Sequence, residues 1–248
     1  MDLQALCDLG QQQLMQTDYL SAEATLEEAE RQAWGLQDFD TLSRVLMPLQ
    51  ETRRQRRQRC GEGEVCLDLL AQGPEDHLDG HRVIENYPHG QLLVAGWGSI
   101  EPAMKVRALA REHGMYVEAF LGAVYAMGDA RVVVIVPNEE VALPDVKPRS
   151  VDDLVRRLPP HSLILGENEL PKGSRKGSPQ TFAEVMAMWE RLHAPFLAAA
   201  DMQVDLVQKI EGYRRTIRVD YACELAHQKA SGVAKEILRS RRKHAASA

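Results

Sequence analysis

The chain contains few aromatic residues, few cysteines and no long apolar run. Its 248 residues include 5% Phe, Trp and Tyr and four cysteines: Cys7, Cys60, Cys66 and Cys223. No window approaches the roughly eighteen apolar residues of a membrane-spanning helix, and the first residues lack the pattern of a signal peptide. Four scattered cysteines are too few for a disulfide framework. We therefore expect a cytoplasmic protein with reduced thiols and no membrane partner.

A motif diagnostic of catalysis or cofactor binding is also lacking. No Ser-His-Asp or Cys-His arrangement can be recognised, and the eight histidines are dispersed. Cys60, Cys66, His77 and His81 follow in the order C-x5-C-x10-H-x3-H, but these intervals differ from those of zinc fingers. We therefore expect no metal and no cofactor. Whether the chain is an enzyme stays open, and the missing catalytic motif favours a role without catalysis.

Charge is unevenly distributed along a chain whose net charge is −6. Residues 51–60, ETRRQRRQRC, contain five arginines. Such a stretch is typical of nucleic-acid binders, but no aromatic residue lies among these arginines to stack on bases. On a helix, Arg53 and Arg56 extend the preceding apolar stripe and Arg57 flanks it. We therefore predict that Arg53, Arg56 and Arg57 form a polar contact between domains, and we expect nucleic acid to be an unlikely partner.

The N-terminal residues 3–60 have helical periodicity. Seven positions hold a small residue (Gly or Ala) or a large apolar one at characteristic spacings: Leu6, Leu9, Gly10, Tyr19, Ala22, Leu26 and Ala29. Over about residues 3–36 this pattern resembles one tetratricopeptide repeat, and it does not recur 34 residues later. The resemblance implies two closely packed antiparallel helices and a surface that binds a protein segment. Because one hairpin cannot cover its own apolar face, we expect other helices to cover it.

The middle of the chain changes to short apolar runs separated by helical patterns. We expect strands at residues 64–71, 91–97, 115–125, 131–137 and 162–166, and helices at residues 101–114 and 150–158. Near-continuous apolar strands alternating with helices favour a largely parallel sheet, and the turn MGDAR predicts one antiparallel pair. The stretch PKGSRKGSP, residues 171–179, is typical of an exposed loop, and helical periodicity follows it.

These patterns predict an α/β module with a mainly parallel sheet, flanked by N- and C-terminal α-helical segments. The expected domains are a tetratricopeptide-like helical segment at residues 1–60, an α/β domain at residues 61–175 and a C-terminal helical segment at residues 176–248.

Candidate ligand-binding residues follow three of the expected strands. Gly96, Gly98 and Ser99 join a strand to a helix, where backbone amides can hold an anion. Two acidic loops follow later strands and contain Asn138, Glu139, Glu140, Glu167, Asn168 and Glu169. If the strands are parallel, both loops lie at the carboxyl edge of the sheet, where open α/β sheets bind ligands. Their carboxylates can bind magnesium or act as acid and base. Alternatively, they are ordinary solvated loop residues, as acidic residues that follow strands commonly are.

Two functions are compatible with this organisation. The first is a protein–protein interaction or scaffold protein that uses the tetratricopeptide-like helices and has a protein partner. The alternative is a small-molecule or nucleotide-binding α/β domain, possibly an enzyme, with its ligand at the carboxyl edge of the sheet.

Overall fold

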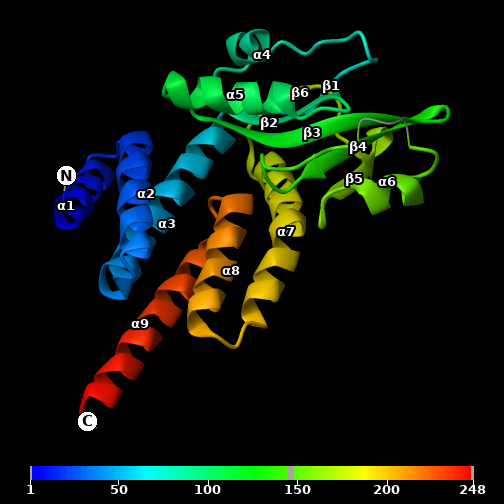
Figure 1. Cartoon of the computed structure of the whole chain (residues 1–248). Coiled ribbons are helices and arrows are strands. Elements are labelled where there is room, and N and C mark those ends of the chain that lie inside the picture. Colours follow the sequence, from blue (N-terminus) through cyan, green and yellow to red (C-terminus); the bar gives the residue numbers. More distant parts are fainter. Residues whose placement is uncertain (1, 145–147, 247–248) are drawn as a thin grey trace. The chain divides into compact units, whose positions relative to one another are not determined.

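The structure, a computed structural model, describes residues 2–144 and 148–246 and divides into two compact units (Figure 1). A helical unit comprises residues 1–56 and 193–248, and an α/β unit comprises residues 57–192. The two boundaries fall inside helices α3 (Phe39–Glu62) and α7 (Pro179–Asp201). None of the helices in the described ranges is long and apolar enough to cross a bilayer. The expected division into three domains, at residues 1–60, 61–175 and 176–248, stays a prediction.

The helical unit is built from parts of α3 and α7 and from four further helices: α1 (Leu3–Met15), α2 (Tyr19–Gly35), α8 (Leu206–Val219) and α9 (Glu224–Ala246). One apolar cluster joins α1, α2 and α3. A larger cluster joins α2 and α3 to α7, α8 and α9. The C-terminal helices therefore share a core with the N-terminal ones. Gly10 allows α1 to approach α2, because a Cβ atom there would lie only 2.6 Å from Leu26.

The two corners of α1–α2–α3 are built alike, 20 residues apart. Thr17 and Gln37 adopt positive φ angles of 61° and 51°. The residue after each, Asp18 or Asp38, accepts a backbone N–H bond with its carboxylate and so caps the next helix. Three backbone hydrogen bonds close the first corner, and the same three recur in the second with a 20-residue offset. The helix corner therefore recurs after 20 residues and not at the 34-residue period of tetratricopeptide repeats.

The α/β unit contains a six-stranded sheet of order β5-β4-β3-β2-β1-β6. Its strands are β1 (Glu64–Leu70), β2 (Gly90–Trp97), β3 (Val117–Met127), β4 (Ala130–Val136), β5 (Leu163–Gly166) and β6 (Ser174–Lys176). The centre, β1-β2-β3, is parallel, whereas β4, β5 and β6 each pair antiparallel with a neighbour. The predicted fold class is confirmed, with a sheet that is parallel in its centre and mixed overall.

Three α-helices lie wholly within the described part of this unit: α4 (Gly80–Asn86), α5 (Glu101–Glu112) and α6 (Val151–Arg157). All three contribute to one apolar cluster with alternate side chains of the sheet. The side chains between these point to the opposite face, where Phe120 of β3 stacks on Trp189 of α7 with ring centroids 4.2 Å apart. The expected strands and the hairpin between β3 and β4 are present, whereas α4 was not predicted and β6 lies in the stretch predicted to be a loop.

Candidate functional site

The turn at residues 96–99 is closed by its own hydrogen bonds. Gly98 has a φ of 58° and donates its N–H to Val124, and the N–H of Glu101 is bonded to the Ser99 hydroxyl. A Cβ atom on Gly96 would lie 2.7 Å from the Ser99 carbonyl oxygen. Pro102, the second residue of α5, has no N–H to offer. Most of the donors that could hold an anion at this turn are therefore engaged within the chain.

The two acidic loops lie at opposite edges of the sheet. Because β4 is antiparallel to β3, its end at Val136 pairs with Leu121, and the following residues 138–140 lie toward the amino edge. There Glu139 contacts Arg107 of α5 at 3.4 Å. The expectation that both loops gather at the carboxyl edge is wrong for residues 138–140, because it depended on a parallel orientation that β4 does not have.

The second acidic stretch forms a short 3₁₀ helix, η1 (Glu167–Glu169), and does lie at the carboxyl edge, but its first carboxylate is already neutralised. Glu167 accepts two bonds from the guanidinium of Arg131, at 2.7 and 2.8 Å, and a third from Lys172. Burial would raise the pKa of Glu167, but these cations hold it below its ordinary value. Three strand spacings separate this loop from the turn after β2, or about 14 Å. The alternative of ligand binding at this edge stays a prediction.

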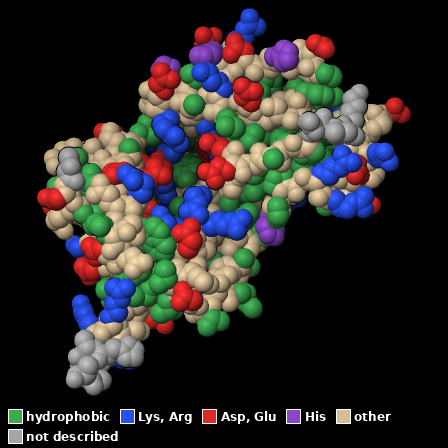
Figure 2. Space-filling model, in the orientation of Figure 1, with side chains coloured by type: hydrophobic (Ala, Val, Ile, Leu, Met, Phe, Trp, Pro, Cys, Tyr) green, Lys and Arg blue, Asp and Glu red, His purple; other side chains and the backbone are tan. Residues whose placement is uncertain are grey.

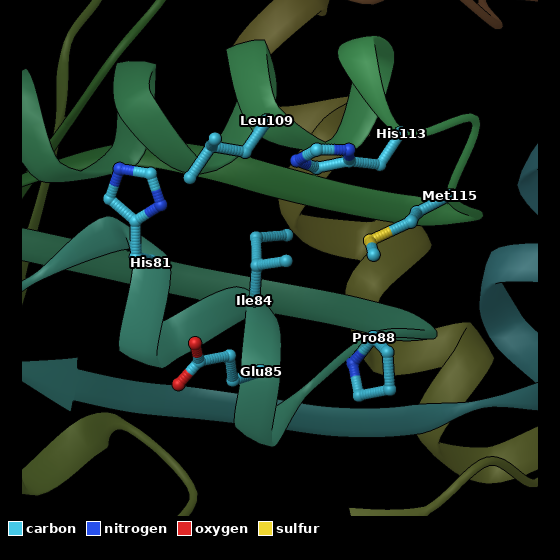
Figure 3. Close-up of a pocket in the computed structure, with 7 residues that line it drawn as sticks. All are labelled: His81, Ile84, Glu85, Pro88, Leu109, His113 and Met115. Carbon is cyan, nitrogen blue, oxygen red and sulfur yellow. The ribbon is translucent and has the colours of Figure 1, made fainter.

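A pocket of about 280 Å³ lies at the amino edge, between α4 and α5 (Figure 3). Its floor includes the buried side chains of Ile84 and Leu109. His81 and His113 lie on opposite sides of this apolar floor, and the Glu85 side chain points away from His113 (Figure 3). The pocket therefore lies at the end of the sheet opposite to the predicted ligand edge.

The arginine stretch is mostly engaged in ion pairs. Within the helical unit, Arg53 contacts Glu23 and Glu27 of α2 at 3.0 and 3.2 Å, and Arg56 contacts Glu23 at 2.7 Å. The side chain of Arg53 is only 6% exposed. Arg54 is 38% exposed and pairs with Glu51 one turn away on the same helix. Arg53 and Arg56 thus extend the buried stripe, whereas Arg54 faces solvent.

His227 of α9 completes this buried network. Its Nε2 lies 3.3 Å from the Arg53 guanidinium, and its Nδ1 lies 2.9 Å from the Cys223 carbonyl oxygen. Burial and the charge of Arg53 lower the pKa of His227 to about 3, so its Nδ1 donates and its Nε2 accepts. Burial would raise the pKa of Glu23, but Arg56 and Arg53 hold it below its ordinary value. The network joins α2, α3 and α9; the predicted role of Arg53 and Arg56 between domains stays a prediction.

Arg57 belongs to a separate polar cluster in the α/β unit. Its guanidinium contacts Glu118 of β3 at 2.7 Å and lies over the ring of Trp189, 4.9 Å from the centroid. Gln91 of β2 donates to the other Glu118 oxygen at 2.6 Å. The side chains of Arg57 and Glu118 are each 3% exposed. Glu118 was not predicted, because no motif marks it within the apolar strand β3. A single charged residue in such a strand nevertheless indicates a buried partner.

A third cluster lies where α7, α8 and α9 meet. His193 Nδ1 is 2.6 Å from an Asp220 oxygen, and Cys223 is a further hydrogen-bonding neighbour of the imidazole. Burial would lower the pKa of His193, but the hydrogen bonds to Asp220 and Cys223 raise it to about 10. Across the described ranges, this is the single group of three or more His, Cys, Asp or Glu side chains with the geometry to hold a metal ion. The C-x5-C-x10-H-x3-H residues therefore do not converge on such a group.

One end of the helical unit exposes large apolar side chains at its corners. Leu36 in the α2–α3 corner is 72% exposed, and Met202 and Val204 in the α7–α8 corner are 81% and 94% exposed. Both corners lie at the same end of the unit (Figure 1). Arg241 near the end of α9 lies over the ring of Phe39, which follows the α2–α3 corner. We call Leu36, Met202, Val204 and the basic residues of α9 (Arg239, Arg241, Arg242 and Lys243) the end face.

Comparisons with known proteins identify no relative of this chain. The chain matches no protein-family model, no curated protein and no solved structure. Inferences about function therefore rest on the residues themselves.

Proposed function

We propose that the chain is a protein-binding scaffold whose helical unit binds a partner segment at the end face. The observation that carries this proposal is the exposure of Leu36, Met202 and Val204, three large apolar side chains at one end of the unit. Covering one such side chain typically contributes about 1.5–3 kcal/mol, so a partner that covers all three gains a substantial apolar contact. Apolar anchors of this kind dominate the binding energy of many interfaces.

The charge at this end indicates the chemistry of the partner. Four of the five residues 239–243 are basic, and no acidic residue follows Glu236. Lys and Arg side chains lie along the last described turns of α9 (Figure 2). A partner segment that combines apolar with acidic residues would complement both parts of the end face. The tetratricopeptide-like pattern of residues 3–36 supports the same function, because repeat helices of that family present surfaces to peptides.

We also propose that the chain acts in a reducing compartment such as the cytoplasm. All four cysteines, Cys7, Cys60, Cys66 and Cys223, are free and buried. Cysteines usually remain free thiols in the reducing compartments of a cell, whereas they form disulfides in oxidising compartments.

A pull-down from nuclease-treated native extract tests the binding function. The bait is the full chain, compared with Leu36→Ser/Met202→Ser/Val204→Ser and with Val151→Ser/Val155→Ser as the matched control. The control residues are also apolar and are 46% and 53% exposed, but they lie on α6 of the α/β unit. We expect a reproducible protein that the wild type and the control recover and that the triple variant loses. Equal recovery by all three baits would contradict the proposal.

A further inference from the structure

The meeting point of α7, α8 and α9 gathers three different metal-binding groups. His193 comes from the body of α7, Asp220 is the C-cap residue that follows α8, and Cys223 immediately precedes α9. One atom from each side chain lies within 4.8 Å of one atom from each of the others. Their side chains take no part in the end face or in the Arg53 ion pairs, although the backbone carbonyl of Cys223 accepts a hydrogen bond from His227. The proposed function therefore does not explain why the three side chains converge.

The corner between α8 and α9 holds two of these groups in place. The N–H of Cys223 donates to the Asp220 carbonyl oxygen at 3.0 Å, and the N–H of Ala222 donates to Asp220 Oδ1 at 3.2 Å. This leaves Oδ2 directed at His193 Nδ1, 2.6 Å away. Backbone bonds to a ligating carboxylate are the orienting contacts that metal sites use around their ligands.

The cluster is buried, which makes its charge balance decisive. The Asp220 side chain is fully buried and that of His193 is 14% exposed. A buried carboxylate needs a compensating cation close to it. A divalent ion held by one carboxylate, one thiolate and one neutral imidazole has its charge balanced by the two anionic ligands.

We propose that His193, Asp220 and Cys223 form a binding site for a divalent transition-metal ion, with Zn²⁺ as the best match. Imidazole nitrogen, carboxylate oxygen and thiolate sulfur are the donors that Zn²⁺ takes, at about 2.0–2.3 Å in tetrahedral geometry. Such bond lengths place the donors about 3.3–3.8 Å from one another. His193 Nδ1 and Asp220 Oδ2 are now 2.6 Å apart, and all three donor atoms lie within 4.8 Å of one another, so shifts of about 1 Å or less bring them to these distances. Three protein ligands leave the fourth position to water or to another group.

Cobalt binding to the full-length chain tests the proposal, because Co²⁺ reports ligand type and geometry in zinc sites by its absorption spectrum. After chelator treatment, Co²⁺ is titrated into the wild type, Cys223→Ser, Asp220→Asn and the control Cys7→Ser, whose thiol is buried in the same helical unit away from this cluster. We expect one equivalent of Co²⁺ with a thiolate-to-metal charge-transfer band, displaced by Zn²⁺. The band should vanish in Cys223→Ser and persist in Cys7→Ser, and Asp220→Asn should weaken binding at least about tenfold.

A wild-type spectrum without the charge-transfer band at one equivalent, or an unchanged band in Cys223→Ser, would overturn the metal site and leave a buried ion pair. X-ray absorption spectroscopy of the zinc-loaded wild type identifies the ligand atoms directly, so this test does not depend on whether a variant folds. We expect one sulfur ligand together with nitrogen or oxygen ligands, because the cluster contains one of the four cysteines. Zero or several sulfur ligands would contradict the assignment. Neither result depends on the partner bound at the end face.

Discussion

Replacing Arg53 by methionine should destabilise the helical unit far more than replacing Arg54, its neighbour on α3. Arg53 is 6% exposed and contacts Glu23, whose side chain is 10% exposed, at 3.0 Å. Its guanidinium also lies 3.3 Å from the Nε2 atom of His227. Methionine keeps much of the apolar stem of the arginine but removes every one of these polar contacts. Glu23 then retains Arg56 as a partner, and His227 loses its donor.

The expected cost follows from what stays buried without a partner. Removing one member of a buried ion pair typically costs about 3–5 kcal/mol, and the remaining contact of Glu23 with Arg56 at 2.7 Å lowers this. An acceptor left unsatisfied at His227 adds about 1–3 kcal/mol. We therefore expect Arg53→Met to cost about 3 kcal/mol. Arg54 and Glu51 are 38% and 40% exposed, so Arg54→Met should cost about 0.5 kcal/mol or less.

Urea denaturation followed by circular dichroism measures both effects. For urea m values of about 1–3 kcal/mol/M, a loss of about 3 kcal/mol lowers the midpoint by about 1–3 M, whereas Arg54→Met should leave the midpoint almost unchanged. Midpoints for the two variants that agree within error would refute the reasoning, because they would show that the buried network carries no more stability than a surface ion pair.

Buried polar groups and a close helix contact give three more expected outcomes. The pKa of His227 is about 3 in the folded state and 6.5 ordinarily, so the stability of the wild type should fall as pH drops below about 6.5, by up to about 1.4 kcal/mol per pH unit. His227→Gln should remove this loss between pH 7 and 5. Urea midpoints that change equally with pH in the wild type and in His227→Gln would contradict this expectation. Gly10→Ala should cost about 1–3 kcal/mol in the same assay because of the contact with Leu26, whereas Gly35→Ala, with nothing within 4 Å, should be neutral or stabilising. Glu118→Gln should lower the melting temperature measured by calorimetry, because the buried guanidinium beside it loses its counter-charge; an unchanged value would contradict its role.

Periodicity predicted most of the fold because burial dictates it locally. The strands β1 to β5 and helices α5 and α6 are visible as apolar runs and capped helical patterns. Strand β6 was missed because its three residues, Ser174–Lys176, are polar and pair only at an edge, where no apolar pattern is required. The orientation of β4 follows from the turn MGDAR, but its consequence for residues 138–140 requires the register of the whole sheet.

The sites were less predictable because they depend on contacts between distant residues. Helical phase placed Arg53 on a buried stripe, but its partners Glu23 and His227 lie 30 and 174 residues away and are not marked by any local motif. The Asp220–Cys223 spacing, D-x-x-C across a helix corner, was the available indication of the metal-binding cluster. Its third member, His193, lies on another helix and could not be paired with it from sequence alone.

Binding of the recovered partner to the end face is the most direct test of the central claim. Calorimetric titration of that partner into the wild type, Leu36→Ser/Met202→Ser/Val204→Ser and Val151→Ser/Val155→Ser measures the contribution of the exposed corners. We expect the triple variant to bind the partner at least about tenfold more weakly than the wild type, and the control to match the wild type. A tenfold change corresponds to about 1.4 kcal/mol of binding free energy, which the loss of covered apolar side chains exceeds. Equal affinity of the triple variant and the wild type would contradict the account.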